Sequence, residues 1–333
     1  MKAILVQCGS AAQDSSAFTV VEQPLPEPGP RDLLVRVQAI GMNPVDTKVR
    51  MRTDGFNVLG WDAVGIVEKT GEQVQKFSAR DRVFYAGDIT RPGCNSDYHL
   101  VDERIAAPAP HSLSLEDAVA MPLTSITAWE SLFERLEFTA QAGANRGRNI
   151  LIIGGAGGVG SVATQLAHWA GLTVYATASR SETVDWCKKM GADQVLNHRN
   201  NLFEQLRATG AGAVDAIFCT TQMEQHWHGM AECIRPHGRI VLIDDPVNPL
   251  DITVFKKKSV SISWEFMFTR SMFATGDMGE QGKILETVAG LLNQGAIVTT
   301  RRKTWTGLTP ENIRHMHLEQ ESGTMVGKQV LLF

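Results

Sequence analysis

The positions of apolar and polar residues divide the chain into an early part of strand-like segments and a later part with helices. Segments at 1–7, 33–41 and 62–71 are rich in β-branched and apolar residues. The proline-rich run at 24–32 separates the first two and excludes regular structure between them. Short strands at such close intervals predict a compact, mostly β domain over the first third of the chain.

Helical periodicity follows the predicted β domain. The segment 114–136 has apolar residues at helix spacing, with Ser114 as a candidate N-cap and Pro122 near its middle. We therefore expect a helix that is kinked or broken at Pro122. After a loop at 141–148, the wholly apolar segment 149–154 predicts a strand of a parallel sheet.

Beyond this strand, helices and strands alternate regularly. Such alternation is typical of a doubly wound α/β domain with a parallel sheet. Gly171 and Gly191 each stand at the end of a predicted helix, where glycine is common. The predicted helices are 161–171, 181–192, 201–210 and 225–234, and the predicted strands are 172–178, 194–197, 213–220 and 238–244.

The last part of the chain returns to short apolar strands. The segment 260–268 predicts an edge strand, 282–295 an amphipathic helix and 328–333 an apolar strand. Because the end of the chain resembles its beginning, we expect the tail to complete the first domain and the α/β unit to be an insertion. The expected boundaries are 1–122 with 282–333 for the β domain and 123–281 for the inserted domain.

The bulk composition argues against several classes of protein. The net charge is −4, and the densest basic run is only Lys256 to Lys258, so no nucleic-acid partner is expected. No segment approaches the ~20 apolar residues that cross a bilayer, and the N-terminus lacks the apolar stretch of a signal peptide. The five cysteines are scattered, which favours a reducing compartment. We therefore expect a cytoplasmic protein without membrane contact.

The strongest chemical signal is the glycine-rich segment GGAGGVG at 154–160, which lies between a predicted strand and a predicted helix. Its spacing fits the pattern G-x-G-x-x-G of dinucleotide-binding turns. There the first glycine allows a tight turn, the second lets the backbone approach a pyrophosphate, and the third lets helix and strand pack closely. The predicted cofactor contacts are Gly155, Ala156, Gly157, Gly158, Val159 and Gly160. The alternative is a strand-to-helix turn that binds no ligand.

The residues about twenty positions further on favour NADPH over NADH. NAD-binding domains usually place an acidic residue there to hold the ribose 2′-hydroxyl group. This chain has Ser179 and Arg180 instead, with no acid before Glu182. A hydroxyl donor and a guanidinium suit a 2′-phosphate, which a carboxylate would repel. The alternative is that Arg180 is merely solvated at the start of a helix.

Several stretches, taken in order, resemble the medium-chain dehydrogenase/reductase family. The closer resemblance is to its quinone oxidoreductase-like branch, whose members are often labelled zinc-type alcohol dehydrogenase-like. The resemblance covers essentially the whole chain and implies an α/β protein. In that fold a GroES-like β domain is split between the two chain ends, and a Rossmann doubly wound domain is inserted. The matching stretches are 35–46 (VRVQAIGMNPVD), 60–71, 77–87, 123–129, 154–160 and the closing GKQVLLF.

The chain departs from the zinc-dependent members of this family at their metal ligands. Asn43 stands where those members have a cysteine, and Trp61 and Asp62 stand where they have a histidine and a glutamate. The region of their structural zinc site, 88–110, holds only Cys94. Amide and indole groups are poor zinc ligands, so we expect no metal. The alternative is zinc held by unconventional ligands such as Asp46, Asp62 and Cys94.

Without a metal to polarise a carbonyl group, the reaction needs an acceptor that spreads the incoming negative charge by itself. Quinones and α,β-unsaturated carbonyl compounds do so, and hydrogen-bond donors stabilise the resulting oxyanion. We therefore expect an NADPH-dependent oxidoreductase acting on a small quinone or enone. The alternatives are an atypical zinc alcohol dehydrogenase and a non-catalytic NADPH-binding protein. The candidate reaction-centre residues are Asn43, Asp46, Trp61, Asp62 and Thr127, with Tyr85 as a possible proton donor.

The resemblance implies further contacts with the cofactor. It places Thr127 under the nicotinamide ring. The other implied cofactor contacts are Ser125, His198, Thr220, Asp244 and Lys328, besides Ser179 and Arg180.

The apolar segment 260–268 is expected to be an edge strand that another chain covers. We therefore expect two copies of the chain to pair there as a homodimer.

Overall fold

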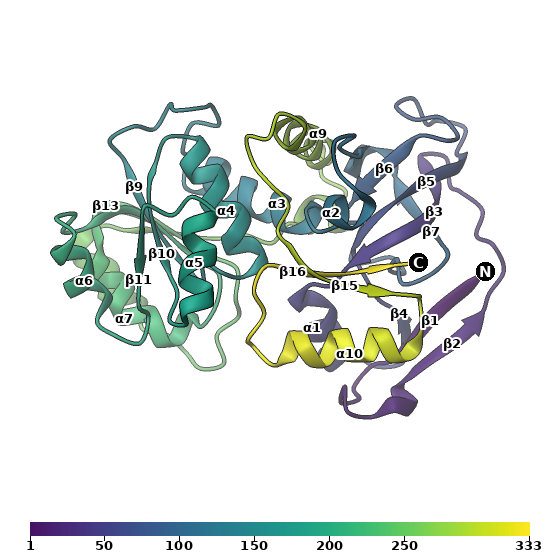
Figure 1. Cartoon of the computed structure of the whole chain (residues 1–333), viewed down its shortest axis with the longest axis horizontal. Coiled ribbons are helices and arrows are strands. Elements are labelled where there is room, and N and C mark those ends of the chain that lie inside the picture. The colour runs from purple at the N-terminus through teal and green to yellow at the C-terminus, as the bar shows by residue number, and fades with distance from the viewer. The chain divides into compact units, whose positions relative to one another are not determined.

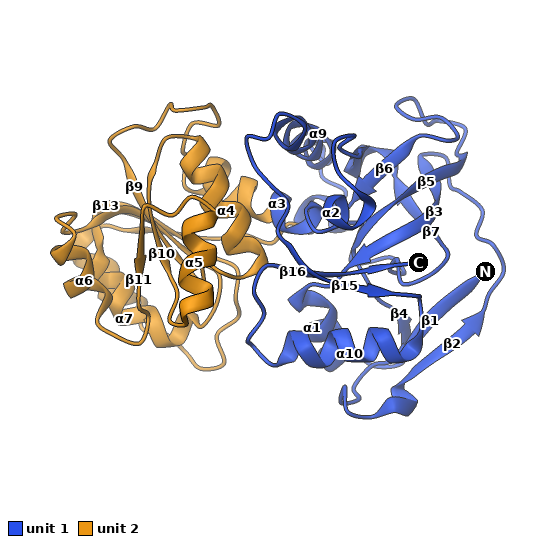
Figure 2. Ribbon diagram, viewed as in Figure 1, with its two compact units in different colours: residues 1–126, 268–333 blue, residues 127–267 orange.

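The computed structural model describes residues 1–333, which form two compact units (Figure 2). Unit 1 combines residues 1–126 with residues 268–333, and unit 2 consists of residues 127–267. The tail of the chain therefore returns to the N-terminal domain, as the similar strand patterns at the two chain ends predicted. The architecture is the expected one, a split β domain with an inserted α/β domain.

The unit boundaries differ from the boundaries 122/123 and 281/282 that we expected from the sequence. The first junction lies inside helix α3 (Pro122–Trp129), which runs on without a break. At the second junction, the residues from 268 onward pack in unit 1, where the ring centroid of Phe268 lies 6.1 Å from that of Trp61. Neither junction is marked in the sequence by a change in the pattern of apolar residues.

Two sheets form the body of unit 1 (Figure 1). The smaller sheet has the order β2-β1-β4, and the larger has the order β15-β16-β3-β5-β6-β8, with β7 also paired to β3. The C-terminal strand β16 runs antiparallel to β3, with Val330 opposite Gly41. The strands are β1 (Lys2–Gln7), β2 (Phe18–Glu22), β3 (Asp32–Gly41), β4 (Phe56–Val58), β5 (Asp62–Thr70), β6 (Arg82–Tyr85), β7 (Tyr98–Asp102), β8 (Ala106–Pro108), β15 (Arg301–Thr306) and β16 (Lys328–Leu332).

Most helices of unit 1 are short. Two of them, α1 and α10, were not predicted, because few of their residues are both apolar and buried; in α10 only Ile313, Met316 and His317 are buried. Both begin with a proline at the first helical position, which needs no N–H partner there. The helices of unit 1 are α1 (Pro44–Arg52), α2 (Leu115–Val119), α8 (Thr269–Met272), α9 (Glu280–Asn293) and α10 (Pro310–Glu321), and its 3-10 turns are Ser15–Ala17 and Glu103–Ile105.

No helix of the chain has the length and apolar composition that crossing a membrane requires.

The predicted helix over 114–136 is three consecutive pieces. Ser114 caps α2 as expected, accepting a hydrogen bond from the Asp117 N–H at 3.2 Å. Pro122 does not kink one helix but begins a second, α3, since its missing N–H is harmless in a first turn. A π-helical segment (Glu130–Arg135) follows directly.

Unit 2 is built on a wholly parallel sheet with strand order β11-β10-β9-β12-β13-β14. Helices α4 and α5 cover one face and α6 and α7 the other (Figure 1). The chain changes direction across the sheet between β9 and β12, which is where doubly wound sheets bind ligands. The elements are β9 (Asn149–Ile153), α4 (Gly158–Trp169), β10 (Thr173–Thr177), α5 (Ser181–Lys189), β11 (Gln194–Leu196), α6 (Leu202–Ala208), β12 (Val214–Cys219), α7 (Met223–Cys233), β13 (Ile234–Leu242), a 3-10 segment (Ile252–Lys258) and β14 (Ser261–Trp264).

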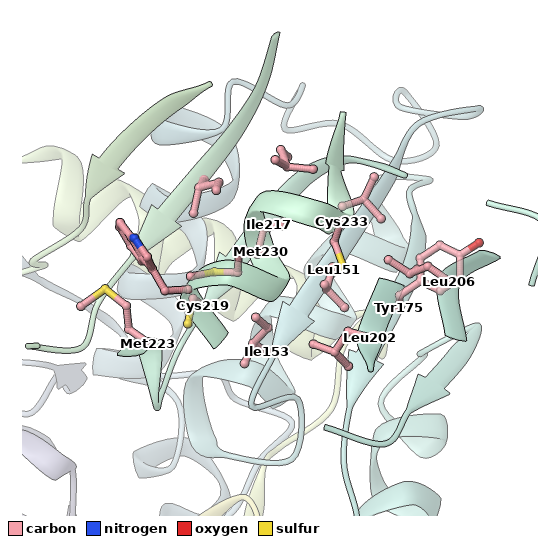
Figure 3. Packing of buried hydrophobic residues seen from close by; sticks show 14 of the residues in the cluster. Leu151, Ile153, Tyr175, Leu202, Leu206, Ile217, Cys219, Met223, Met230 and Cys233 are labelled. Atoms are coloured by element: carbon pink, nitrogen blue, oxygen red, sulfur yellow. The ribbon is translucent and has the colours of Figure 1, made fainter. Parts of the chain in front are cut away.

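A buried apolar cluster holds α6 and α7 against the sheet (Figure 3). The strands contribute every second side chain, because alternate residues of a strand point to the same face. The helices contribute residues at helical spacing. The cluster includes Leu151, Ile153, Ile217 and Cys219 from the strands and Leu202, Leu206, Met223, Trp227 and Met230 from the helices. This packing fixes the ends of β9, which the glycine-rich turn follows, and of the neighbouring strand β12.

The predicted edge strand over 260–268 is real but shorter. Only Ser261–Trp264 pairs with β13, and β14 is the last strand of the sheet on that side. The chain leaves the sheet at Glu265, whose buried carboxylate makes an ion pair with Arg135 at 2.9 Å. Trp264 and Phe266 are largely exposed at this edge.

Candidate functional site

The glycine-rich turn joins the end of β9 to the start of α4. A Cβ on Gly160 would lie 2.2 Å from the Gly154 carbonyl oxygen, and one on Gly155 would lie 2.7 Å from the Cβ of Ala176. The packing of the protein itself therefore requires these two glycines. A Cβ on Gly157 would meet only the Gly154 oxygen, at an ordinary 3.5 Å. No neighbouring atom of the protein excludes a side chain at 157. A phosphate that binds close to the backbone would require glycine at this position.

The start of α4 is suited to an anion. Gly157 is the N-cap and offers no side chain to the first N–H groups of the helix. The first turn of α4 carries no acidic residue that would compete with an anion. The N–H groups of Gly158, Val159 and Gly160 lie at the positive end of the helix dipole. The residues present therefore fit the pyrophosphate of a dinucleotide, in the place that the motif predicted.

The other predicted cofactor residues of unit 2 follow the carboxyl ends of neighbouring parallel strands, so the fold brings them to one edge of the sheet. Thr220 is held in place by a hydrogen bond from its hydroxyl group to the Ile153 carbonyl oxygen at 2.8 Å. The Asp244 carboxylate accepts a bond from the Gln222 N–H at 3.1 Å. Ser179 and Arg180 follow β10, His198 follows β11, Thr220 follows β12 and Asp244 follows β13.

A second histidine lies beside His198. The ring centroids of His198 and His226 are 6.3 Å apart, and burial is the first cause that lowers the pKa of each. We predicted no functional role for His226 from the sequence, because it belongs to none of the recognised motifs. It lies within α7. His228, two residues further on, is exposed on another face of that helix, so the two do not form a ligand pair.

Two of the candidate reaction-centre residues of unit 1, Asn43 and Asp62, form a buried hydrogen-bonded cluster with Lys328, the first residue of β16. Its ammonium donates to the Met42 carbonyl oxygen at 2.6 Å, to Asn43 Oδ1 at 2.5 Å and to Asp62 Oδ2 at 2.9 Å. Asn43 Nδ2 also donates to Asp62 Oδ2, at 2.7 Å, and the Leu123 N–H donates to Asp62 Oδ1 at 2.7 Å. The resemblance implied a cofactor contact for Lys328, but its three donors all go to the protein. A role in this cluster could not be read from a lysine in an apolar closing strand.

Asp46 is a second buried carboxyl group beside this cluster. Its Oδ2 accepts a bond from the Asn43 N–H at 2.7 Å, and its Oδ1 has no partner. Burial raises the pKa of Asp46 to about 7, against the lowering effect of the Asn43 bond and of Lys328. Lys328 pairs directly with Asp62 and leaves the Asp46 charge largely uncompensated.

Two other candidate donors are already used inside unit 1. Trp61 Nε1 donates to the Asp88 carbonyl oxygen at 3.2 Å. The hydroxyl group of Tyr85 lies 3.1 Å from His99 Nδ1, and His99 Nε2 lies 2.9 Å from the Pro92 carbonyl oxygen. A carbonyl can only accept, so Nε2 carries the ring hydrogen and Tyr85 donates to Nδ1. The Tyr85 hydrogen is thus committed to the fold.

Ser125 and Thr127 lie two residues apart on α3. The Ser125 hydroxyl group is fully buried and has no hydrogen-bond partner. Such an orphan hydroxyl in a helix is uncommon, because serine normally bonds to a carbonyl of the preceding turn. Thr127 is also buried. Both residues stand where the chain passes from unit 1 into unit 2.

The residues that the resemblance places at zinc-ligand positions do not fit zinc. Asn43 uses its amide oxygen and one amide hydrogen within the cluster, and Trp61 presents an indole donor. Cys94 is held as a thiol, since burial raises its pKa well above the usual value, and its Sγ donates to the Asp62 carbonyl oxygen at 3.3 Å. No group of three or more His, Cys, Asp or Glu side chains is arranged to hold a metal ion. The cation at this place is the Lys328 ammonium.

Two family models match the chain. The model described as the alcohol dehydrogenase GroES-like domain matches residues 29–111, and that described as zinc-binding dehydrogenase matches residues 158–278. The first match falls in unit 1 and the second begins at the N-terminus of α4. They correspond to the split β domain and to the dinucleotide-binding part.

Curated proteins and solved structures align with most or all of the chain, and one curated reductase aligns with about half of it. A zinc-type alcohol dehydrogenase-like protein of Staphylococcus aureus is 44% identical over 96% of both chains. A 2-methylene-furan-3-one reductase of Solanum lycopersicum is 35% identical over 52% of this chain and 46% of its own. A crystal structure from Rhizobium etli, described as that of a candidate zinc-dependent alcohol dehydrogenase, has a TM-score of 0.96 at 44% identity and covers 100% and 98% of the two chains. The Escherichia coli quinone oxidoreductase complexed with NADPH shares the fold, with a TM-score of 0.85 at 23% identity over 100% of both chains.

The contrast between Gly157 and Gly160 gives a matched pair of variants. Gly160→Ala should destabilise the fold by about 1–3 kcal/mol, because its methyl group overpacks the turn. Gly157→Ala should change the free energy of unfolding by less than about 0.5 kcal/mol, because its methyl group makes only an ordinary contact with the Gly154 oxygen. It should nevertheless weaken dinucleotide binding at least tenfold, or about 1.4 kcal/mol. Urea unfolding and fluorescence titration measure the two effects, and unchanged binding in Gly157→Ala would exclude the turn as the phosphate site.

Asp46→Asn should stabilise the protein at alkaline pH but not at acidic pH. The pKa of Asp46 is about 7 in the folded chain, against an ordinary 3.8, so the unfolded chain releases the proton first and stability falls as the pH rises. Asparagine stays neutral, so its advantage should grow by up to about 1.4 kcal/mol per pH unit between pH 4 and 7. Urea unfolding across this range measures it, with the exposed Asp54→Asn as control. A difference that does not vary with pH would show that Asp46 stays ionised when buried.

Proposed function

We propose a reaction for this chain on the premise that it belongs to the medium-chain dehydrogenase/reductase superfamily. As a member of this superfamily, the chain is an oxidoreductase. Within this class we propose that the chain transfers a hydride from NADPH to a quinone or an α,β-unsaturated carbonyl compound, without zinc. Its substrate is then a small molecule that enters at the reaction-centre residues.

The observation that carries this proposal is the cluster around Lys328. A zinc ion polarises the substrate oxygen of an alcohol or ketone as the hydride moves. Here the ammonium of Lys328, already paired with Asp62, is the cation at this place, and two of the side chains at the ligand positions, Asn43 and Asp62, are hydrogen-bonded to each other. The chain thus lacks a Lewis acid for simple ketones. Quinones and enones delocalise the incoming charge and need only hydrogen bonds, correct position and exclusion of water.

In this proposal each candidate residue has its own role. Thr127 and Ser125 orient the nicotinamide and the acceptor from α3. Asn43 supplies an amide donor for the developing oxyanion, and Asp62 and Asp46 hold that amide and its backbone in place. Trp61 forms an apolar wall, since its indole hydrogen is already bonded to the Asp88 carbonyl.

The choice of NADPH rests on the end of β10. Ser179 and Arg180 stand there in place of an acidic residue, beside the start of α5. The E. coli quinone oxidoreductase of the same fold was solved with NADPH, which agrees with this choice. The Solanum relative, by its name, reduces an enone, which agrees with the proposed acceptor class.

We also propose that the chain works as a homodimer in the cytoplasm. Strand β14 is an open sheet edge with Trp264 and Phe266 largely exposed, and a second copy would cover it. Light scattering on the purified protein reports the mass, and a monomer would refute the dimer. The five free, buried cysteines agree with a reducing compartment.

Two other functions compete with this proposal. The names of the S. aureus and R. etli relatives favour a zinc-dependent alcohol dehydrogenase. The observation against it is that the ligand positions hold Asn43 and Trp61 and that Lys328 provides the charge. A protein that binds NADPH without turnover is the third possibility, and only an activity assay separates it from the first.

The acceptor class and the metal can be tested on the same purified protein. We expect NADPH oxidation with benzoquinone, naphthoquinone or a short enal, and no change in rate after dialysis against a chelator. Elemental analysis should find far less than one zinc per chain. Zinc at one per chain together with loss of turnover on its removal would support the alcohol dehydrogenase. Tight NADPH binding without consumption of any acceptor would support the non-catalytic protein.

The phosphate contact can be tested by one substitution. Arg180→Ala should weaken NADPH binding at least tenfold, or about 1.4 kcal/mol, because a charge-assisted bond to the 2′-phosphate is lost. NADH binding should change by less than about twofold. Fluorescence titration with the two nucleotides measures the ratio. An equal loss for both would place the 2′-phosphate away from Arg180. Arg207→Ala, on the exposed side of α6, serves as the matched control.

A further inference from the structure

The Lys328 ammonium fixes the orientation of the Asn43 amide. Oδ1 of Asn43 faces the ammonium at 2.5 Å, and Nδ2 faces the Asp62 carboxylate at 2.7 Å. A flipped amide would set its NH2 group against the ammonium and its oxygen against the carboxylate, so both contacts would be repulsive. All three side chains are buried, where such charge-assisted bonds are strong. The orientation of the amide is therefore set by charge.

Asp62 is itself held in place. Its Oδ2 accepts from both Lys328 and Asn43, and its Oδ1 accepts from the Leu123 N–H at the start of α3. The lysine thus connects the last strand of the chain to the beginnings of α1, β5 and α3. Removing its charge would leave a buried carboxylate without a counter-ion and an amide free to turn.

One hydrogen of the Asn43 amide remains. An amide nitrogen carries two hydrogens, and Asp62 takes one of them. The bonds of Asn43 are to Asp46, Asp62 and Lys328, so the second hydrogen has no acceptor in the protein. Building on the proposed function, we propose that Lys328 is a positioning residue of the reaction. It holds Asn43 so that this second hydrogen is donated to the oxygen of the quinone or enone as negative charge develops there.

The step balances without any change of charge in the cluster. The C4–H bond of the reduced nicotinamide would break and leave NADP⁺, while the hydride forms a bond to the acceptor carbon and the displaced π electron pair moves to the acceptor oxygen. Asn43 donates a hydrogen bond to that oxygen and keeps its proton, while the proton that completes the product comes from water. A donor aimed at a developing oxyanion typically accounts for about 10²–10³ in kcat. Lys328 acts through Asn43 and does not touch the acceptor.

The first test substitutes the lysine by an uncharged side chain of similar length. Lys328→Met should lower kcat with the best acceptor about 100-fold. The Kd of NADPH should change less than about threefold, because no donor of Lys328 is available to the cofactor. In the background of Asn43→Ala, which should be equally slow, adding Lys328→Met should lower kcat by less than about threefold. A much weaker NADPH complex with unchanged kcat would overturn the proposal in favour of a cofactor contact.

The second test separates positioning from stability. Lys328→Ala leaves a cavity beside Asp62, and ethylammonium added to this variant should restore kcat at least about tenfold while leaving Lys328→Met unchanged. The same amine should raise the Tm of Lys328→Ala and not that of the wild type. If the single variants do not fold, Lys328→Met with Asp62→Asn removes both charges and should fold but stay slow. Full activity in that double variant would overturn the proposal.

The controls distinguish this inference from the proposed function. Lys283→Met, which breaks only a surface ion pair with Glu280, should leave kcat unchanged. A wild-type protein that reduces no acceptor refutes the proposed function. A wild-type protein that is active while Lys328→Met keeps its kcat refutes only the positioning role.

Discussion

The buried ion pair between Lys328 and Asp62 connects the parts of unit 1 that the sequence separates most widely. It joins the last strand of the chain to β5, whose first residue, Asp62, stands at a metal-ligand position of the zinc-dependent members, and Asn43 also bonds to both residues. Such a pair is costly to bury, and removing one partner typically costs about 3–5 kcal/mol. The arrangement is therefore stable only when the tail is docked. The contact thus joins the two chain ends that make up the split β domain, at the candidate reaction-centre residues.

The same cluster occupies the positions at which zinc-dependent members of the superfamily hold their metal, and it is the basis of the zinc-free reaction that we propose. A divalent metal needs ligands with free lone pairs, but here the amide, the carboxylate and the ammonium satisfy one another. The S. aureus and R. etli relatives share the fold and 44% of the aligned residues. The reaction depends on the side chains at the centre, since one fold supports several chemistries.

In unit 2 the candidate dinucleotide site depends mainly on backbone geometry. At the three motif positions of the turn, Gly155 and Gly160 are required because neighbouring atoms would collide with a side chain, whereas a Cβ on Gly157 would make only an ordinary contact. The parallel strands then bring Ser179, Arg180, Thr220 and Asp244 to the same edge. A cofactor site of this kind can be recognised from the sequence because its requirements are local.

The sequence by itself determined the fold class, the inserted domain, the glycine-rich turn and the departure from zinc ligands, because each depends on residues that are neighbours along the chain. It did not reveal α1 and α10, whose apolar stripes are weak, or the shortness of β14. Only the tertiary structure decided that Lys328 joins Asn43 and Asp62, that Tyr85 donates to His99, and that the Trp61 indole is bonded to Asp88. Those contacts join residues far apart in the sequence, and hydrogen-bond partners at such separations are chosen by packing, which no local pattern records.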